Sequence, residues 1–101
     1  QNRLKSILQT DADKCFLCGG GRGIEPLDKH HVFGGASRKA SERYGLTVYL
    51  HHSKCHIFGN NSVHANREIR DELSAYAQRA AMKHYGWTKE EFIEKFGRSW
   101  V

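Results

Sequence analysis

Cysteine and histidine, the side chains that most often bind zinc, recur in this sequence at ligand-like spacings. Cys15 and Cys18 form a Cys-x-x-Cys pair that runs directly into residues 19–23, four of which are glycine. The backbone of such a loop can turn both thiolates toward one ion. Further along the chain, Cys55 together with His51 or His52 would complete the four ligands of a closed, tetrahedral zinc site.

Two other roles share these residue types. Redox-active pairs have the same Cys-x-x-Cys spacing, but they are expected where a strand meets a helix in a βαβ unit, and a glycine-rich loop does not match that context. Three cysteines, an odd number, also disfavour a full disulfide framework. The sequence therefore predicts structural zinc, with free thiols or a single disulfide as the alternative.

Two adjacent histidines, His30 and His31, stand in the stretch DKHHVFGG. In an extended segment successive side chains point to opposite faces, so one histidine should face inward and the other outward. If Cys55 faces the zinc, the next residue, His56, faces elsewhere. A hairpin followed by a helical segment can then bring His30, His31 and His56 together on the face away from the zinc. The alternative is two unrelated histidines, one exposed and one hydrogen-bonded in a core.

The elements that must position these side chains follow from the apolar spacing. LDKHHVF (27–33) and LTVYLH (46–51) are the best strand candidates, and the second alternates apolar and polar residues as a half-buried strand does. The segment between them is too long for a tight turn, and its second half predicts a short helix that ends at Gly45. The opening stretch 3–9 has apolar residues at helical spacing but is short, so we expect a frayed turn or arm.

Two helices are predicted in the second half of the chain. The longer one covers residues 66–85, with Asn66 as the N-cap and Gly86 as the stop. Its apolar stripe consists of Ile69, Leu73, Tyr76, Ala77 and Ala80. A final short helix begins after Thr88, which forms a capping box with Glu91, and its expected buried residues are Phe92, Ile93 and Phe96. The two tryptophans, Trp87 and Trp100, are expected to pack in the core or against the C-terminal segment.

The combined pattern C-x-x-C … DKHHVFGG … RKASERYGLTVYL … CH … VH-N resembles the HNH endonucleases, specifically the compact, zinc-stabilised kind carried by phages and prophages. The resemblance extends from about Lys5 to Gly97. It implies an α+β fold: a small ββα-metal finger stapled by structural zinc, followed by a long helix and a short final helix. Residues 1–101 would form one HNH nuclease domain that hydrolyses DNA phosphodiester bonds with the help of a divalent cation.

The resemblance also implies roles for individual residues. His31 would be the general base that activates water, and a histidine suits this task because its unperturbed pKa is about 6.5. His30 and His56 would be ligands of one catalytic cation, which could be Mg²⁺, Mn²⁺, Ni²⁺ or Zn²⁺. The structural zinc would be held by Cys15, Cys18, Cys55 and a histidine, where the family usually has a cysteine.

The sequence departs from the family pattern at two places. His52 keeps the usual two-residue spacing to Cys55, whereas His51, which we prefer as the fourth zinc ligand, leaves three residues between. The asparagine in the middle of the family motif is absent from its usual position, near which Thr47 stands; Asn60, Asn61 and Asn66 all come later. His64 either joins the catalytic cation or is a polar residue ahead of a helix N-cap.

The net positive charge of the chain indicates the kind of partner it could bind. Lysine and arginine exceed aspartate and glutamate by five, and the sequence pI is about 9.3, which favours a polyanion such as nucleic acid. Arg38, Lys39 and Arg43 lie next to the predicted active site and could contact phosphates of double-stranded DNA with little sequence preference. Their alternative role is that of a solvated surface loop.

Two other functions remain open from the sequence. One is a zinc finger that binds DNA without cleaving it, which the displaced asparagine favours; the other is a zinc-dependent interaction module without a nucleic-acid partner. A length of 101 residues indicates one domain. The chain has no apolar run of about 18 residues and nothing that resembles a signal peptide, so we expect no membrane association. Reduced cysteines and the lack of an export signal suggest the cytoplasm, and the resemblance implies a bacterial or phage-infected cell.

Overall fold

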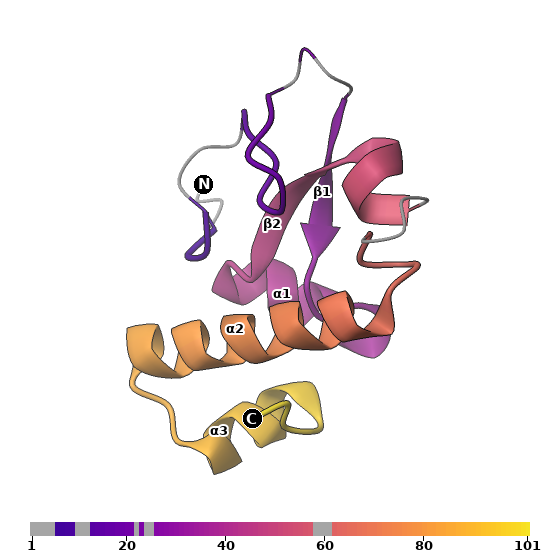
Figure 1. Ribbon diagram of the computed structural model, residues 1–101. Coiled ribbons are helices and arrows are strands. Elements are labelled where there is room, and N and C mark those ends of the chain that lie inside the picture. Colours follow the sequence, from indigo (N-terminus) through magenta and orange to yellow (C-terminus); the bar gives the residue numbers. More distant parts are fainter. Residues whose placement is uncertain (1–5, 10–12, 22, 24–25, 58–61) are drawn as a thin grey trace.

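The centre of the fold is a two-stranded antiparallel sheet of β1 (Leu27–His31) and β2 (Thr47–His51), shown in Figure 1. The computed structural model describes residues 6–9, 13–21, 23, 26–57 and 62–101. Leu27 pairs with His51 at one end of the hairpin, and His31 pairs with Thr47 at the other. Both predicted strands are confirmed. The hairpin therefore carries one histidine pair near the end of β1 and a second at the end of β2.

The connection between the strands is helical. A short 3-10 turn, η1 (Gly35–Ser37), leads into α1 (Arg38–Tyr44), which ends at Gly45 as predicted. Gly45 has a φ of 74°, a left-handed conformation that glycine adopts without the strain a Cβ would introduce. The buried Ser41 hydroxyl donates to the Phe33 carbonyl at 2.7 Å and accepts from the Phe33 amide at 3.0 Å. These two bonds fix α1 against the segment that follows β1.

After β2 the chain forms one π-helical turn, η2 (His52–Ile57), and then two α-helices, α2 (Arg67–Tyr85) and α3 (Lys89–Phe96). The Asn66 side chain caps α2 by accepting from the Ile69 amide at 3.1 Å, and Gly86 ends the helix. The capping box between Thr88 and Glu91 is present at the start of α3. Both helices and their caps are thus confirmed, and the fold is a small α+β arrangement.

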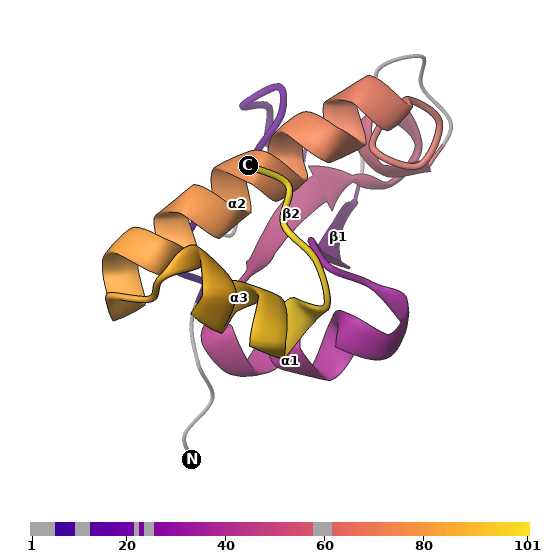
Figure 2. The same cartoon turned by 90° about the horizontal axis from the view of Figure 1, so that it is seen from below.

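The helices pack around the end of the hairpin at which β1 finishes. Figures 1 and 2 show α2 crossing that end, with α1 and α3 beside it. Phe33 lies at the centre of the contact, with its ring centroid 5.4 Å from that of Phe92, 4.9 Å from that of Phe96 and 4.7 Å from that of Trp100. Trp87 packs edge-on against Tyr44 of α1 at 4.8 Å. The predicted packing role of the tryptophans is confirmed.

Two residues predicted to be buried are not. Tyr76 is 48% exposed and Ile93 is 37% exposed. Both lie at the edge of an apolar stripe, where helical periodicity defines a face wider than the one the core covers. Tyr76 instead packs against Phe16, with ring centroids 5.6 Å apart.

The described part of the N-terminal stretch, residues 6–9, is docked and not frayed. The Ile7 amide donates to the Gly45 carbonyl at 2.9 Å, and the Ser6 hydroxyl donates to the Thr47 carbonyl at 2.6 Å. Leu8 is buried in the core. Residues 3–5 of the same prediction lie outside the described residues. Within the described part of the chain, none of the helices has both the length and the apolar composition that crossing a bilayer requires.

Candidate functional site

Four side chains from the glycine-rich loop, the end of β2 and η2 converge on one point: Cys15, Cys18, His51 and Cys55. Their ligand atoms all lie within 4.8 Å of one another. His51 Nδ1 lies 3.2 Å from Cys18 Sγ, and its Nε2 lies 2.9 Å from the Gly21 carbonyl oxygen. Because the carbonyl can only accept, Nε2 carries the proton and Nδ1 presents its lone pair to the thiols. A metal-ligating histidine is typically oriented in this way, so these four residues could hold a metal ion such as zinc.

The loop that carries the first two cysteines is shaped by its own backbone. The Gly19 amide donates to the Cys15 carbonyl, and the Cys15 amide donates to the Gly20 carbonyl, both at 2.8 Å. Gly19 has a φ of 78°, which a residue with a side chain rarely adopts. The Phe16 amide donates to the Tyr49 carbonyl at 2.8 Å and so attaches the loop to β2. The glycines predicted to turn the loop therefore do so next to β2.

The thiols of this group affect one another's ionisation. Burial would raise the pKa of Cys15, but hydrogen bonds from its neighbours, first the backbone at Cys18, lower that pKa to about 7. Burial and the nearby Cys15 thiolate raise the pKa of Cys55. Without a cation Cys55 therefore stays a neutral thiol at neutral pH, whereas zinc binding would favour its thiolate form. The cysteines, all within the described residues, are free and form no disulfide.

A second group consists of three histidines, His30, His56 and His64, whose ligand atoms also lie within 4.8 Å of one another. His56 Nε2 and His64 Nε2 are 3.2 Å apart, and the His30 ring centroid lies 5.1 Å from that of His56. His30 is only 8% exposed, and its Nε2 is buried without a hydrogen-bond partner among the described residues. A buried nitrogen left unpaired is costly, and a metal ion would satisfy it. The three histidines could therefore hold a cation.

The same surroundings keep His30 in the form that binds metals. Burial lowers the pKa of His30 to about 3, and positive charge on His56 and His64 acts in the same direction. At neutral pH His30 is thus an uncharged imidazole. The lone pair of such an imidazole is what a metal ion requires.

Backbone and side-chain contacts hold the other two histidines in place. Asp28 Oδ2 lies 3.0 Å from His56 Nδ1 and 2.6 Å from His52 Nδ1. The carboxylate therefore fixes the proton of His56 on Nδ1 and leaves its Nε2 free to bind. The His64 amide donates to the His56 carbonyl at 3.1 Å, which brings His64 into the group. His52, the alternative zinc ligand, is turned toward Asp28 and lies outside both groups.

His31 does not join the other histidines, contrary to the expectation that His30, His31 and His56 meet on one face. Successive residues of β1 point to opposite faces, and His31 Nε2 lies 2.8 Å from Glu42 Oε1 of α1. The other oxygen of Glu42 accepts from Lys29 at 2.9 Å. Hydrogen bonds from Lys29 and His31 lower the pKa of Glu42, so it is a carboxylate at neutral pH. The predicted divergence of the adjacent pair is confirmed.

The three cations predicted to contact DNA, Arg38, Lys39 and Arg43, lie on α1 and are exposed. Lys39 and Arg43 line a shallow hollow together with Lys95 of α3. The same helix presents Glu42 to His31, so these cations stand on the element that positions the histidine.

The sequence did not indicate Asp28 or Glu42 as functional, because their partners are distant in the chain. The glutamate precedes Arg43 in a segment whose charges suggested only phosphate contacts. Comparison with known proteins adds no assignment: no family model, curated protein or solved structure matches the chain.

Proposed function

We propose that this protein is a metal-dependent endonuclease that hydrolyses DNA phosphodiester bonds, as its resemblance to the HNH endonucleases implies. The observation that carries the proposal is the convergence of His30, His56 and His64, with an unpaired buried nitrogen, one residue away from His31. The proposal rests on the difference between this group and the cysteine group, and on the hydrogen bond of His31.

The two groups differ in the way that structural and catalytic metal sites differ. The cysteine group offers four protein ligands, which fill a tetrahedral coordination shell and suit a structural zinc. The histidine group offers three, which leaves a coordination position for water or a phosphate oxygen. His64 is exposed, so substrate can approach from that side. The cysteine group can stabilise the fold without the histidine group. The open coordination position of the histidine group therefore favours a catalytic role.

Each residue of the site would have its own role in hydrolysis. Glu42 accepts the Nε2 proton of His31, which leaves Nδ1 as the atom that can take a proton from the attacking water. His30, His56 and His64 would hold the cation. When bound, a divalent cation stabilises the negative charge that develops on the phosphate and the leaving oxygen. Glu42 would thus do the orienting work for which the family motif uses its asparagine.

A plasmid assay tests the proposal. Zinc-loaded protein is incubated with supercoiled plasmid and Mg²⁺, Mn²⁺ or Ni²⁺, and nicked and linear products are separated on a gel. We expect cleavage by the wild type and a loss of roughly 10²–10⁴-fold in His31→Ala, the usual contribution of a general base. His30→Ala should lose activity that a higher Mn²⁺ concentration partly restores, because it removes a ligand and not the base.

His84→Ala is the matched control, because His84 is an exposed histidine on α2 outside both groups. It should cleave like the wild type. Unchanged cleavage in His31→Ala and His30→Ala would mean that these histidines are structural, and the nuclease proposal would then be wrong.

The absent asparagine favours one competing function, a zinc finger that binds DNA without cleaving it. In that case the wild type would shift DNA in a gel but leave plasmid intact with every cation. The unpaired nitrogen of His30 counts against this function, because a binding module has no need of a second metal site.

A further inference from the structure

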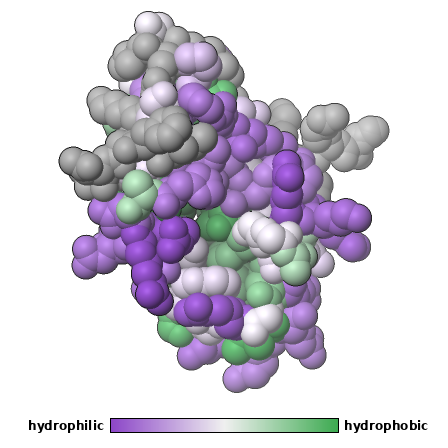
Figure 3. Space-filling model, turned by 90° about the vertical axis from the view of Figure 1, so that its right-hand side faces the viewer, coloured by the Kyte–Doolittle hydropathy of each residue, from purple (hydrophilic) through white to green (hydrophobic). Residues whose placement is uncertain are grey.

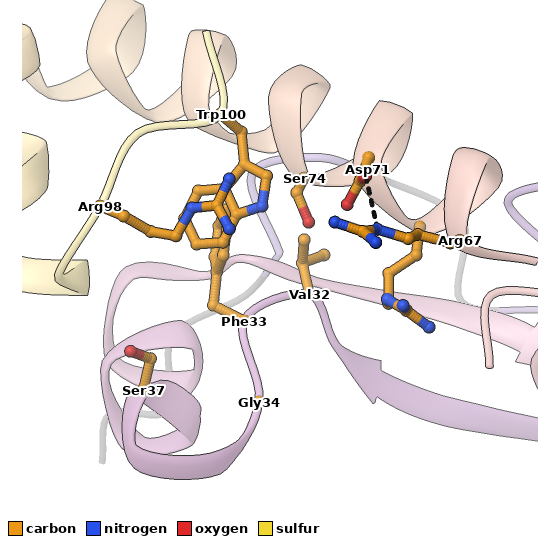
Figure 4. Close-up of a pocket in the computed structure, with 10 residues that line it drawn as sticks. Val32, Phe33, Gly34, Ser37, Arg67, Asp71, Ser74, Arg98 and Trp100 are labelled. Carbon is orange, nitrogen blue, oxygen red and sulfur yellow. Dashed lines mark ion pairs between the residues drawn. The ribbon is translucent and has the colours of Figure 1, made fainter.

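A cavity of about 350 Å³ lies between the start of α2, the segment after β1 and the C-terminal tail. Arg67 and Arg70 of α2 and Arg98 of the tail line it. Figure 4 shows Arg98 over the Trp100 ring on one side and Arg67 with Asp71 on the other. This volume is at the lower end of the range for small-molecule sites and is enough for one nucleotide.

The arginines on α2 contribute little to folding, because Arg67 forms an exposed ion pair with Asp71 and the Arg70 side chain makes a long hydrogen bond to the Val63 carbonyl. Arg67 is the first residue of the helix, and Arg70 lies one turn later on the same side. Positive side chains near a helix N-terminus oppose the helix dipole, and like charges three residues apart repel each other. An anion in the cavity would reverse both effects, because guanidinium groups and the N-terminus of a helix attract negative charge.

The groups that line the cavity are suited to phosphate. Arg98 lies with its guanidinium carbon 4.6 Å from the centre of the Trp100 ring, which fixes its plane. Arg70 donates one N–H to the Val63 carbonyl at 3.3 Å and retains further donors. Arg67 contacts Asp71, the one acidic side chain among the described residues of the lining, at 3.6 Å. Three guanidinium groups against one carboxylate leave two positive charges.

The two net positive charges of the cavity favour one kind of phosphate ester over another. A phosphate monoester carries about −1.5 to −2 charges at pH 7, whereas an internal phosphodiester carries one. The cavity therefore complements a monoester better than a link within a strand. Figure 3 shows the side of the molecule on which α2 begins, where hydrophilic residues predominate and hydrophobic residues gather in the lower half. Val32 and Phe33, both buried, form the apolar part of the cavity together with Trp100.

The cavity and the histidine group are built from neighbouring segments of the chain. Val32, which lines the cavity, directly follows His31, the last residue of β1. Arg70 contacts the carbonyl of Val63, the residue before His64. Arg70 therefore links the cavity to the segment that carries His64.

We infer that this cavity binds the phosphate monoester of a nucleotide, either at the end of a DNA strand or in a free mononucleotide. Hydrolysis of a phosphodiester leaves one new strand end as a monoester, so a strand end would be a product of the proposed reaction. That source of the ligand rests on the proposed function, whereas binding of the monoester does not. The experiment therefore measures binding.

Zinc-loaded protein without added Mg²⁺ is titrated by calorimetry with a short single-stranded DNA carrying a 5′-phosphate. The same oligonucleotide with a 5′-hydroxyl, its 3′-phosphorylated form, thymidine 5′-monophosphate and inorganic phosphate are titrated in parallel. We expect a terminally phosphorylated strand to bind at least tenfold more tightly than the unphosphorylated one, the effect of one charge-assisted hydrogen bond or more. If thymidine 5′-monophosphate binds as tightly as the phosphorylated strand, the result would support the site and assign it to free nucleotides.

Variants distinguish binding in the cavity from nonspecific attraction of anions to the positively charged protein. Arg67→Gln and Arg98→Gln should each weaken monoester binding roughly tenfold to a hundredfold, and Asp71→Asn should strengthen it. Arg79→Gln is the matched control, because Arg79 is an exposed arginine of α2 outside the cavity. Equal affinities with and without a terminal phosphate, or equal weakening by Arg79→Gln, would overturn the inference. Monoester binding by a protein that cleaves no plasmid would retain this site and overturn only the proposed function.

Discussion

Replacing Asp28 by asparagine tests whether the histidine group binds a metal. Asp28 Oδ2 accepts hydrogen bonds from Nδ1 of both His56 and His52, and the one to His56 leaves Nε2 facing the group. The amide side chain of the variant would keep a single carbonyl oxygen and lose the negative charge. The Asp28→Asn variant should therefore hold His56 less firmly in the tautomer that binds a cation.

The size of the effect follows from the surroundings of the carboxylate. Loss of an outer-shell partner typically costs 10–100-fold in metal affinity. Asp28 is shared between two histidines, and its side chain is 32% exposed, so solvent partly replaces the lost contact. We therefore expect a loss near the lower limit, about tenfold, which corresponds to about 1.4 kcal/mol of binding free energy.

The assay is calorimetric titration of the zinc-loaded protein with Mn²⁺, with zinc content measured by mass spectrometry to verify that the cysteine group stays occupied. His52→Ala is the matched control, because it removes the other partner of the same carboxylate and belongs to neither group. It should bind Mn²⁺ nearly as the wild type does. Unchanged affinity in Asp28→Asn, or an equal loss in His52→Ala, would refute the reasoning.

Three further predictions concern the other parts of the site. Cys55→Ser should reduce zinc content and abolish cooperative thermal unfolding, because a zinc ion held by the cysteine group would supply much of the folding free energy; a folded, zinc-free wild type would contradict this. Glu42→Ala should slow plasmid cleavage yet lower the free energy of unfolding by no more than about 1 kcal/mol, because the Glu42 side chain is 41% exposed and water can replace its contacts; Lys29→Ala, which spares the bond to the histidine, should cleave normally. Joint replacement of Arg38 and Lys39 by alanine should lower the salt dependence of DNA binding by a slope of about 0.9 per lost phosphate contact; an unchanged slope would make them surface residues only.

The elements of the fold were predictable because each depends on local sequence. Alternation along β2 and the glycine that follows α1 define their own segments without reference to the rest of the chain. The caps of α2 and α3 are likewise set by residues within one turn of the helix start. The π-helical form of η2 was not predictable, because it depends on how the turn meets β1 and the segment before α2.

The candidate site was predictable only in part, for the same reason. Spacing suggested which residues have metal-binding chemistry and left His52 as the alternative to the preferred His51. It is His51 that lies with the cysteines, at the end of β2. The hydrogen bond between His31 and Glu42 joins two elements, and the one between Asp28 and His56 spans 28 residues. No local pattern encodes such pairs. The arginine cavity was not predictable, because Arg98 is far in sequence from Arg67 and Arg70 of α2.

The direct succession of Cys55 and His56 in η2 has a consequence for the order in which the molecule assembles. One residue belongs to the cysteine group and the next to the histidine group, so a single turn must wind before either is complete. Zinc capture by the cysteines would wind that turn during folding, since structural zinc sites form together with their fold. The same turn would bring His56 to His30 and His64, so under the proposed function zinc binding at the cysteine group precedes cation binding at the histidine group.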